Sequence, residues 1–485
     1  MNALTRDLIK LVDMTEEMMK EKEQKEGADY REKLHLMPPV GWLNDPNGLC
    51  QLNGIYHAFF QYSPFNAEGG VKMWGHYTSK DMIDWEYQGV KLYPDQPFDC
   101  HGVYSGSAFI EDDKMYVYYT GNVKLEDGDF DYINTGRESN TVLVVSEDGK
   151  TFGPKKELMR NVDYPSDLTC HVRDPKIWKE GDTYYMIQGA RTKEDVGQAL
   201  IFESKDKINW NFRSRVESEE PFGYMWECPD LFEMDGQLYI ICCPQGVETQ
   251  GIDYENVHQV TAMKLDYDFD TDEYEITDIK LFDRGFDFYA PQSFEDESGR
   301  RILIGWMGIP DADYTNPTEE AGWQHALTIP RELSVRDGKL IQEPIEELKQ
   351  LRSEDKAVCT FCYGQTIIMQ NAIYEAIVDF KRCREMVMTL REGITLSYKD
   401  NILTLNLGVY GSGRSTRKVR LEKLEHLQIF ADTSSLEIFV NHGEEVFTTR
   451  IYNHYGRLLI NGECSGIMTV YPLKSFEIQG GRHEE

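Results

Sequence analysis

The sequence predicts an all-β protein, in which a short N-terminal helix is followed by a β-propeller of five repeats and a C-terminal β-sandwich. Five similar segments recur between residues 53 and 307, and each joins a turn to an alternating aromatic and aliphatic strand. Period-two strands separated by turns recur from about residue 357 onward. Apolar residues have roughly helical spacing in the first 27 or so residues, and we expect some helix in the linker at about 340–352.

Composition limits the classes of partner. A chain of 485 residues is longer than one hydrophobic core usually supports, so we expect more than one domain. The net charge of −33 makes nucleic acid or an anionic membrane an improbable partner, because phosphate groups would be repelled. A neutral small molecule fits such a chain better, and the sequence leaves self-association open.

The N-terminal segment and the cysteines indicate a cytoplasmic protein. Neither the first 27 residues nor any later stretch has the uninterrupted apolar run of a signal peptide or membrane span. The ten cysteines are scattered, as expected of reduced thiols in the core. Cys359 and Cys362 have no second pair at a suitable distance, so we expect no zinc site.

The five repeats define equivalent positions. Their markers Tyr56, Tyr116, Tyr185, Tyr239 and Leu303 are 54 to 69 residues apart, about one four-stranded blade with its loops. We therefore expect a strand that lies one step nearer the propeller axis to precede each marker.

Acidic and polar residues stand at a shared offset before these markers. Asp45, Ser105, Asp174 and Gln292 lie eleven residues before theirs, and Glu227 lies twelve before its own. If these positions mark the inner strands, the side chains converge on one axis, and three of them are carboxylates. The alternative is coincidence in a chain with 84 acidic residues.

The carboxylates differ in their neighbours. Asp45 precedes Pro46, which favours extended backbone, although the following Asn-Gly also suits an ordinary surface turn. Glu227 stands between Trp226 and a cysteine, and an apolar flank would raise its pKa, whereas Asp45, beside the donors of Asn44, would stay ionised. Such a pair suits the acid and nucleophile of a glycosidase. A structural salt bridge is the alternative for Arg173 and Asp174.

Residues suited to binding a sugar surround these acids in the sequence. Indoles offer flat apolar faces and amides or hydroxyls offer hydrogen bonds, although each indole could equally be core. The candidates are Trp42, Trp74, Trp226, Trp306, Asn44, Gln61, Ser105 and Gln292. The sequence has no glycine-rich phosphate loop and no His-Cys cluster, so we expect neither a nucleotide cofactor nor a metal.

Seven motifs, in order, closely resemble those of glycoside hydrolase family 32, the family of invertases and sucrose-6-phosphate hydrolases. They are WLNDPNG (42–48), WGH (74–76), YSGSA (104–108), YTGN (119–122), RDP (173–175), ECP (227–229) and FYAPQ (288–292). The resemblance runs from about residue 34 to 333, and the hairpin at 436–452 resembles the C-terminal sandwich of that family. Tyr104 stands where that family commonly has Phe.

The resemblance implies a five-bladed propeller with a deep axial pocket, joined to a sandwich. It implies that Asp45 is the nucleophile, Glu227 the general acid and base, and Asp174 the carboxylate that holds fructose hydroxyls. The substrate-binding residues that we expect from the matching motifs and the ring positions are Trp42, Leu43, Asn44, Gln61, Trp74, Tyr104, Ser105, Arg173 and Trp306.

The predicted activity is retaining hydrolysis of terminal β-D-fructofuranosides, with sucrose 6-phosphate favoured over sucrose and short fructans. Arg137 is the candidate ligand for the phosphate. The alternatives are a fructan exo-hydrolase, an inverting arabinan-type hydrolase, and a sugar-binding propeller without catalysis. The expected domains are residues 1–30 (helical extension), 31–335 (catalytic propeller), 336–355 (linker) and 356–485 (sandwich).

Overall fold

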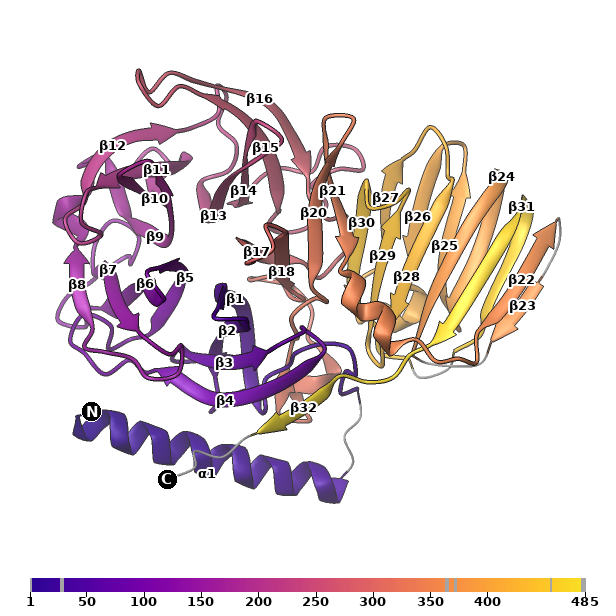
Figure 1. Cartoon of the computed structure of the whole chain (residues 1–485), viewed down its shortest axis with the longest axis horizontal. Coiled ribbons are helices and arrows are strands. Elements are labelled where there is room, and N and C mark those ends of the chain that lie inside the picture. The colour runs from indigo at the N-terminus through magenta and orange to yellow at the C-terminus, as the bar shows by residue number, and fades with distance from the viewer. Residues whose placement is uncertain (1, 27–29, 363–365, 370–372, 454–455, 481–485) are drawn as a thin grey trace.

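The computed structural model describes residues 2–26, 30–362, 366–369, 373–453 and 456–480. Within these ranges the only α-helix is α1 (Ala3–Glu26), and almost all other regular structure is strand. The strands form a ring of sheets around a common centre and a layered β body beside it (Figure 1). The predicted all-β class, with a propeller before a sandwich, is confirmed. No described helix is both long enough and apolar enough to cross a membrane.

Four sheets of the ring are four-stranded, and in each the first strand in the chain lies at one edge. They consist of β5 (Val103–Glu111), β6 (Lys114–Lys124), β7 (Arg137–Ser146) and β8 (Lys156–Met159); β9 (Leu168–Glu180), β10 (Thr183–Thr192), β11 (Gly197–Ser204) and β12 (Asn211–Val216); β13 (Met225–Met234), β14 (Gln237–Gln245), β15 (Thr261–Tyr267) and β16 (Tyr274–Leu281); and β17 (Tyr289–Glu295), β18 (Arg301–Trp306), β20 (Arg331–Arg336) and β21 (Lys339–Pro344).

The first repeat lies in a six-stranded sheet, so the expected count of five four-stranded blades is wrong: four sheets have that form. Its strands are β19 (Trp323–Gln324), β1 (Gly41–Leu52), β2 (Ile55–Ser63), β3 (Met73–Ser79), β4 (Asp84–Leu92) and β32 (Glu477–Gly480). The added strands β19 and β32 pair in parallel with β1 and β4. They cover sheet edges whose backbone groups would otherwise be unpaired. These short segments carry no strand pattern of their own, which is why the sequence did not predict them.

The repeat positions are confirmed. The five marker residues lie on β2, β6, β10, β14 and β18, each the second strand of its repeat. The preceding strands, β1, β5, β9, β13 and β17, contact one another in a closed circuit. They carry Asp45, Ser105, Asp174, Glu227 and Gln292, so these residues lie on the innermost strands, as the shared offset predicts.

The C-terminal strands form the β-sandwich that the period-two pattern predicts. They are β22 (Ala357–Cys362), β23 (Thr366–Met369), β24 (Tyr374–Arg391), β25 (Ile394–Lys399), β26 (Ile402–Asn406), β27 (Thr416–Arg420), β28 (His426–Ala431), β29 (Ser435–Val440), β30 (Glu445–Arg450) and β31 (Leu458–Pro472). The long strand β24 joins the layers, because its first half pairs with β28 and its second half with β25. The predicted hairpin is β29 with β30.

Helix α1 lies along the outer strands of the six-stranded sheet (Figure 1). Its Val12 is buried, and Glu16 Oε1 accepts hydrogen bonds from the hydroxyls of Tyr62 and Tyr87 at 3.0 and 2.9 Å. Burial raises the pKa of Glu16 to about 7. The helix is therefore docked through a carboxyl group whose charge is disfavoured in the folded state.

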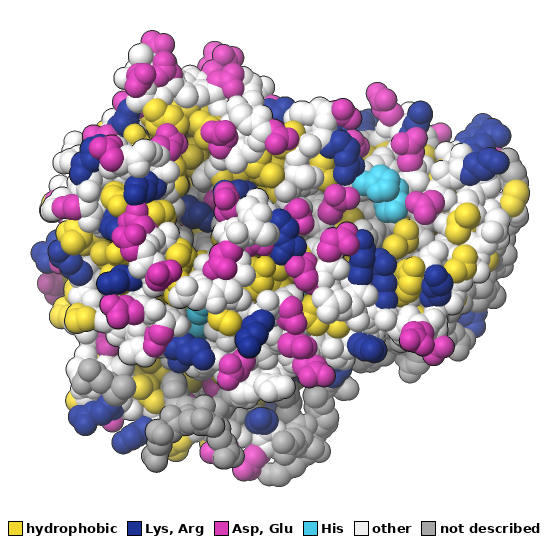
Figure 2. All heavy atoms as spheres, viewed as in Figure 1, with side chains coloured by type: hydrophobic (Ala, Val, Ile, Leu, Met, Phe, Trp, Pro, Cys, Tyr) yellow, Lys and Arg dark blue, Asp and Glu magenta, His cyan; other side chains and the backbone are white. Residues whose placement is uncertain are grey.

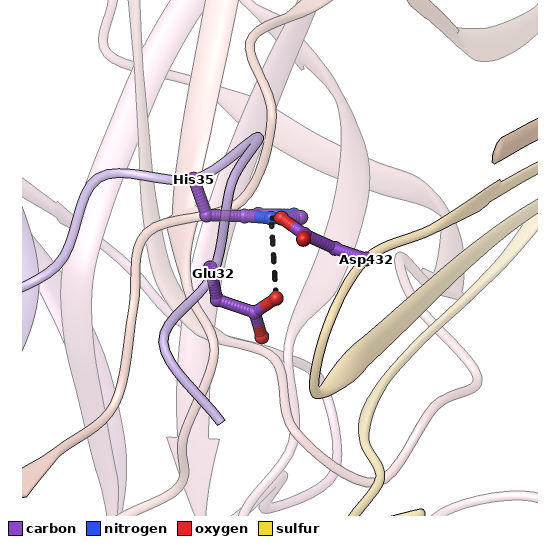
Figure 3. A group of neighbouring side chains, drawn as sticks. All are labelled: Glu32, His35 and Asp432. Atoms are coloured by element: carbon purple, nitrogen blue, oxygen red, sulfur yellow. Dashed lines mark hydrogen bonds and ion pairs between the residues drawn. The ribbon is translucent and has the colours of Figure 1, made fainter. Parts of the chain in front are cut away.

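A buried group of charges joins the propeller to the sandwich. His35 Nδ1 is 2.8 Å from Asp432 Oδ2 (Figure 3). Its Nε2 is 2.9 Å from Glu437 Oε1. Arg331 of β20 donates to Glu437 Oε2 at 2.5 Å. Burial alone would lower the pKa of His35, but the two carboxylates raise it to about 10. Glu32, His35 and Asp432 lie close enough together to hold a metal ion, yet both ring nitrogens already face carboxylates. We therefore interpret the group as an ion-paired clasp.

We expect Glu16→Gln to stabilise the protein at pH 8 by about 1–2 kcal/mol. Because the folded-state pKa is raised, the stability contributed by Glu16 is present below its unfolded pKa and is lost as the pH rises through about 7. The measurement is the melting temperature from pH 5 to 8. The exposed neighbour Glu17→Gln is the control. Parallel pH curves for Glu16→Gln and the unmodified protein would contradict the expectation.

We expect Glu437→Gln to lower the free energy of unfolding by about 3–5 kcal/mol, because it leaves Arg331 without its closest carboxylate in a site with no exposed surface. Urea denaturation measures the loss. The control is Glu444→Gln, which removes an exposed ion pair with Lys339 and should cost no more than about 1 kcal/mol. Equal losses in both variants would show that the clasp does not stabilise the fold.

Candidate active site

A β-bulge interrupts every inner strand at the same level. In each, two residues stand opposite one residue of the neighbouring strand. The bulged pairs are 44–45, 104–105, 174–175, 228–229 and 290–291. A bulge re-aims the side chains around it, and four of the five contain or directly precede a proline, which has no N–H to pair. The local sequence thus breaks strand pairing where the site residues must turn inward.

Asp45 lies in the first bulge and is buried. Asn47 Nδ2 donates to its Oδ2 at 3.0 Å, and the Ser105 hydroxyl, which itself accepts from Gln61 Nε2, also bonds to it. Burial raises the pKa of Asp45 to about 7, the negative charge of Asp174 adds to the rise, and these donors oppose it. The expectation that Asp45 stays fully ionised beside Asn44 donors is therefore wrong. Its amide donor is Asn47.

Asp174 is held by backbone groups. Its Oδ2 accepts from the N–H of Cys228 at 2.9 Å, and its own N–H donates to Thr120 Oγ1 at 3.0 Å. Burial raises the pKa of Asp174 to about 6, while Arg173 opposes the rise. Its φ of +65° is a conformation that non-glycine residues rarely adopt. This strain is consistent with a functional position.

Glu227 lies directly before the fourth bulge and is held by three side chains. Arg173 donates to its Oε1 from Nη2 at 2.6 Å, while the Tyr289 hydroxyl and Gln245 Nε2 donate to Oε2 at 2.7 and 2.9 Å. Arg173 is closer to Glu227 than to Asp174, whose Oδ2 is 3.9 Å from Nε. The guanidinium therefore links two of the three carboxyl groups, beyond the local Arg-Asp pair that the sequence suggested.

The apolar flank expected for Glu227 is not found. The Trp226 indole packs with Tyr185, Ile187 and Ile240 between neighbouring sheets, and its N–H donates to the carbonyl of Phe222. Consecutive strand residues point to opposite faces, so Trp226 and Glu227 cannot share one environment. The position of Glu227, and not an indole beside it, makes it a site residue.

Aromatic rings form one wall of the site. Trp42 lies edge-on to Trp306 and His325, with ring centroids 6.1 and 4.3 Å apart. Asn44 Oδ1 accepts from the Trp42 indole and from Lys72 Nζ. The indole N–H of Trp306 is buried without a hydrogen-bond partner among the described residues. This wall offers a flat apolar surface with polar groups at its edge, as a sugar ring requires.

Two expected sugar contacts are not brought to the site surface. Leu43 and Trp74 have no exposed surface and belong to the hydrophobic core. Leu43 points away because strand residues alternate in direction, and Trp74 packs behind the site, where its N–H donates to the carbonyl of Tyr104. The side chain of Tyr104 remains partly exposed, and that of Gln292 is tied to the carbonyl of Gly106.

Sequence reasoning missed five residues that contact the site. Asn47 and Tyr289 lie within the quoted motifs, and Asn47 could have been found from its position two residues after Asp45. The others are Lys72, Gln245 and His171. Lys72 and Gln245 carry no local signal, because only strand pairing brings them to the site.

The chain is similar to known proteins over most of its length. Residues 35–344 match the model of the glycosyl hydrolases family 32 N-terminal domain, and residues 368–470 match that of the family 32 C-terminal domain. A sucrose-6-phosphate hydrolase of Bacillus subtilis is 38% identical over 464 residues, which cover 93% of this chain and 95% of that protein. One of Staphylococcus xylosus is 36% identical, with 94% of each chain covered.

Solved structures agree. A sucrose-6-phosphate hydrolase from Lactobacillus gasseri superposes with a TM-score of 0.86 at 27% identity and covers 96% of both chains. A Bombyx mori beta-fructofuranosidase variant, solved in complex with sucrose, has a TM-score of 0.82 at 30% identity and covers 96% of this chain and 98% of its own. The domain matches, the identity along the chain and the arrangement of the three acids lead to one conclusion: this chain belongs to glycosyl hydrolase family 32.

Proposed function

We propose that this protein hydrolyses terminal β-D-fructofuranosyl bonds with retention of configuration, and that sucrose 6-phosphate is its preferred substrate. One observation carries the proposal: Asp45, Asp174 and Glu227 are buried or nearly buried on three of the five inner strands that surround the axis, with Arg173 between the last two. A pair of carboxyl groups across a sugar pocket is the machinery of glycoside hydrolysis. The names of the bacterial relatives support the phosphorylated substrate.

In the first step, Glu227 gives its proton to the oxygen that leaves with the glucosyl group. One oxygen of Asp45 bonds to the anomeric carbon of fructose as the glycosidic bond breaks, which yields a covalent fructosyl-enzyme. The hydrogen bonds from Asn47 and Ser105 fix the orientation of the Asp45 carboxyl group. In the second step Glu227 takes a proton from water, which attacks the same carbon and releases Asp45.

Asp174 and Arg173 have separate roles. Asp174 accepts hydrogen bonds from fructose hydroxyls and stabilises the positive charge that develops on the ring in the transition state. Arg173 holds Glu227 in place through its bond to Oε1, so it acts as a positioning residue. Arg173 directly precedes the third bulge and Asp174 lies in it, which supports the view that this bulge orients both side chains.

Three further proposals concern the domain boundaries, the location of the protein and its partner. We propose a helical extension to about residue 30, a catalytic propeller to about residue 335 and a sandwich from about residue 356. Strand β21 of the intervening segment completes the last propeller sheet. We also propose a cytoplasmic location, where a substrate phosphorylated during uptake would be released. We propose that the partner is a small sugar.

Three alternatives stay distinguishable. A fructan exo-hydrolase would act on fructose chains faster than on sucrose. An inverting hydrolase would need carboxyl groups about 6.5–9.5 Å apart, to admit a water molecule, and would release the opposite anomer. A sugar-binding propeller without catalysis would need no proton donor such as Glu227.

The experiment that tests the proposal compares kcat/KM for sucrose 6-phosphate, sucrose and a short fructan, with the anomer of released fructose followed by NMR. We expect the phosphorylated substrate to have the highest value and the β-anomer to appear first. A higher value for the fructan, or first release of the α-anomer, would contradict the proposal.

We expect Asp45→Asn to lower kcat by more than about 10³-fold without unfolding the protein, because the covalent intermediate can no longer form. Glucose release and circular dichroism measure the two effects. The control is Asp113→Asn in an exposed turn between β5 and β6, where Asn tolerates the positive φ. Substantial turnover by folded Asp45→Asn protein would refute the nucleophile assignment.

We expect the acidic limb of the pH profile of kcat/KM to have its midpoint near pH 7, because Asp45 must be ionised to attack. Asn47→Ala removes a donor that favours the ionised carboxylate, so the pKa of Asp45 should rise and this limb should move upward by about one pH unit. The exposed Asn211→Ala variant is the control. An unchanged limb, or a shift to lower pH, would show that Asn47 does not set this ionisation.

A further inference from the structure

Arg137 is a partly buried cation without an acidic partner. Its Nε–H is buried and donates to no acceptor among the described residues. No described carboxylate pairs with its guanidinium group. Burial lowers the pKa of Arg137, which reflects the cost of holding this charge away from water. The chain has 84 acidic and 51 basic residues, and Asp and Glu side chains are spread across the visible face (Figure 2). An unpaired arginine in such a protein calls for an explanation.

Arg137 lies beside the active site, on the side of Glu227. It begins strand β7, which contacts the inner strand β9 that carries Arg173 and Asp174. The ammonium of Lys124, the residue opposite it, lies over the Tyr132 ring, and the Tyr132 carbonyl bonds to His171, whose other ring nitrogen bonds to Arg173 beside Glu227. Since Glu227 protonates the leaving oxygen, Arg137 lies toward the leaving glucosyl group. Lys124 is its direct neighbour across the β6 and β7 ladder.

The other cations nearby are already paired. Arg173 is bound by Glu227, and Arg191 is bound by Asp195 at 2.6 Å. His171 accepts from Arg173 Nη1, so its other ring nitrogen donates to the Tyr132 carbonyl at 3.1 Å. Burial lowers the pKa of His171, as do the surrounding guanidinium groups, so it stays neutral.

Lys124 is a second cation without an acidic partner among the described residues. Its ammonium lies 5.5 Å from the centroid of the Tyr132 ring, and no described carboxylate pairs with it. Two neighbouring cations near Arg173 and Glu227 therefore remain available to an anion.

We propose that Arg137, assisted by Lys124, forms a subsite for the phosphate monoester of the leaving sugar; this inference rests on the proposed function. The guanidinium fork matches two phosphate oxygens, while the ammonium supplies a second charge at the solvent side. The subsite would bind the 6-phosphate of the glucosyl group and leave the fructosyl group between Asp45 and Asp174.

Lys72 is the rival cation. It is partly buried, but its Nζ already donates to Asn44 Oδ1 at 2.8 Å, and the carboxylate whose charge acts on it is Asp45. Lys72 therefore belongs to the fructosyl side, where sucrose 6-phosphate carries no phosphate.

The test measures kcat/KM for sucrose 6-phosphate and for sucrose in the unmodified protein, Arg137→Met, Arg137→Lys and Lys72→Met. We expect Arg137→Met to lower the ratio of the two values by about 10- to 100-fold, the effect of losing hydrogen bonds to a charged group. Arg137→Lys should keep part of the ratio, because it retains the charge without the fork. Arg215→Met is the control, since Arg215 pairs with Asp167 away from the site.

Thermal shift gives a readout independent of turnover. Glucose 6-phosphate and inorganic phosphate should raise the melting temperature of the unmodified protein more than that of Arg137→Met, and glucose should not distinguish the two. Arg137→Met removes a buried charge that has no partner, so the variant without ligand should not melt at a lower temperature than the unmodified protein. This comparison controls for misfolding.

The outcomes separate the two proposals. If the unmodified protein does not prefer sucrose 6-phosphate, the proposed substrate is wrong. If it does, but Arg137→Met keeps the ratio or the phosphate-induced shift, the subsite is wrong and the function stands. A loss of preference in Lys72→Met alone would place the phosphate on the other side of the site.

Discussion

The active site depends on one constraint of the backbone, the bulge that interrupts each inner strand at the same level. A regular strand would turn every second side chain away from the axis, and neighbouring residues such as Arg173 and Asp174 could not both serve one pocket. The bulges remove this restriction. Their cost is visible as positive φ at Asp174, Cys228 and Ala290, each followed by proline. The surrounding pairs of strands keep this strained geometry in place.

The clasp between propeller and sandwich also fixes the geometry of an inner strand. His35 lies in the segment that directly precedes β1 and contacts Asp432 (Figure 3). It also contacts Glu437, so the start of the first inner strand is anchored to the sandwich. Buried ion pairs add little net stability, but an incomplete one is costly. The clasp therefore favours one relative position of sandwich and propeller, and it does so about ten residues before Asp45.

Much of the fold could be predicted because the repeat is local: a turn followed by an alternating strand is visible in the sequence at each marker. The shared offset also placed Asp45, Asp174 and Glu227 on inner strands. What failed depended on long-range contacts. The sequence cannot show that β32 pairs with β4, that Lys72 meets Asn44, or that Trp226 faces away from Glu227. Burial of Asp45, which raises its pKa, likewise follows from the complete ring and not from its neighbours in the chain.

A net charge of −33 would repel a phosphorylated sugar, but electrostatic forces in salt solution act over only about 8 Å. The nearby charges matter most, and there burial raises the pKa of Asp45 to about 7 and of Asp174 to about 6. The pocket is therefore less negative near neutral pH than its three carboxyl groups suggest, while Arg173 offsets Glu227. The desolvation that limits ionisation of the nucleophile thus also reduces repulsion of an anionic substrate. Both effects have one cause, so a substitution that opened the pocket to water would lower the pKa of Asp45 and at the same time weaken binding of the phosphorylated sugar.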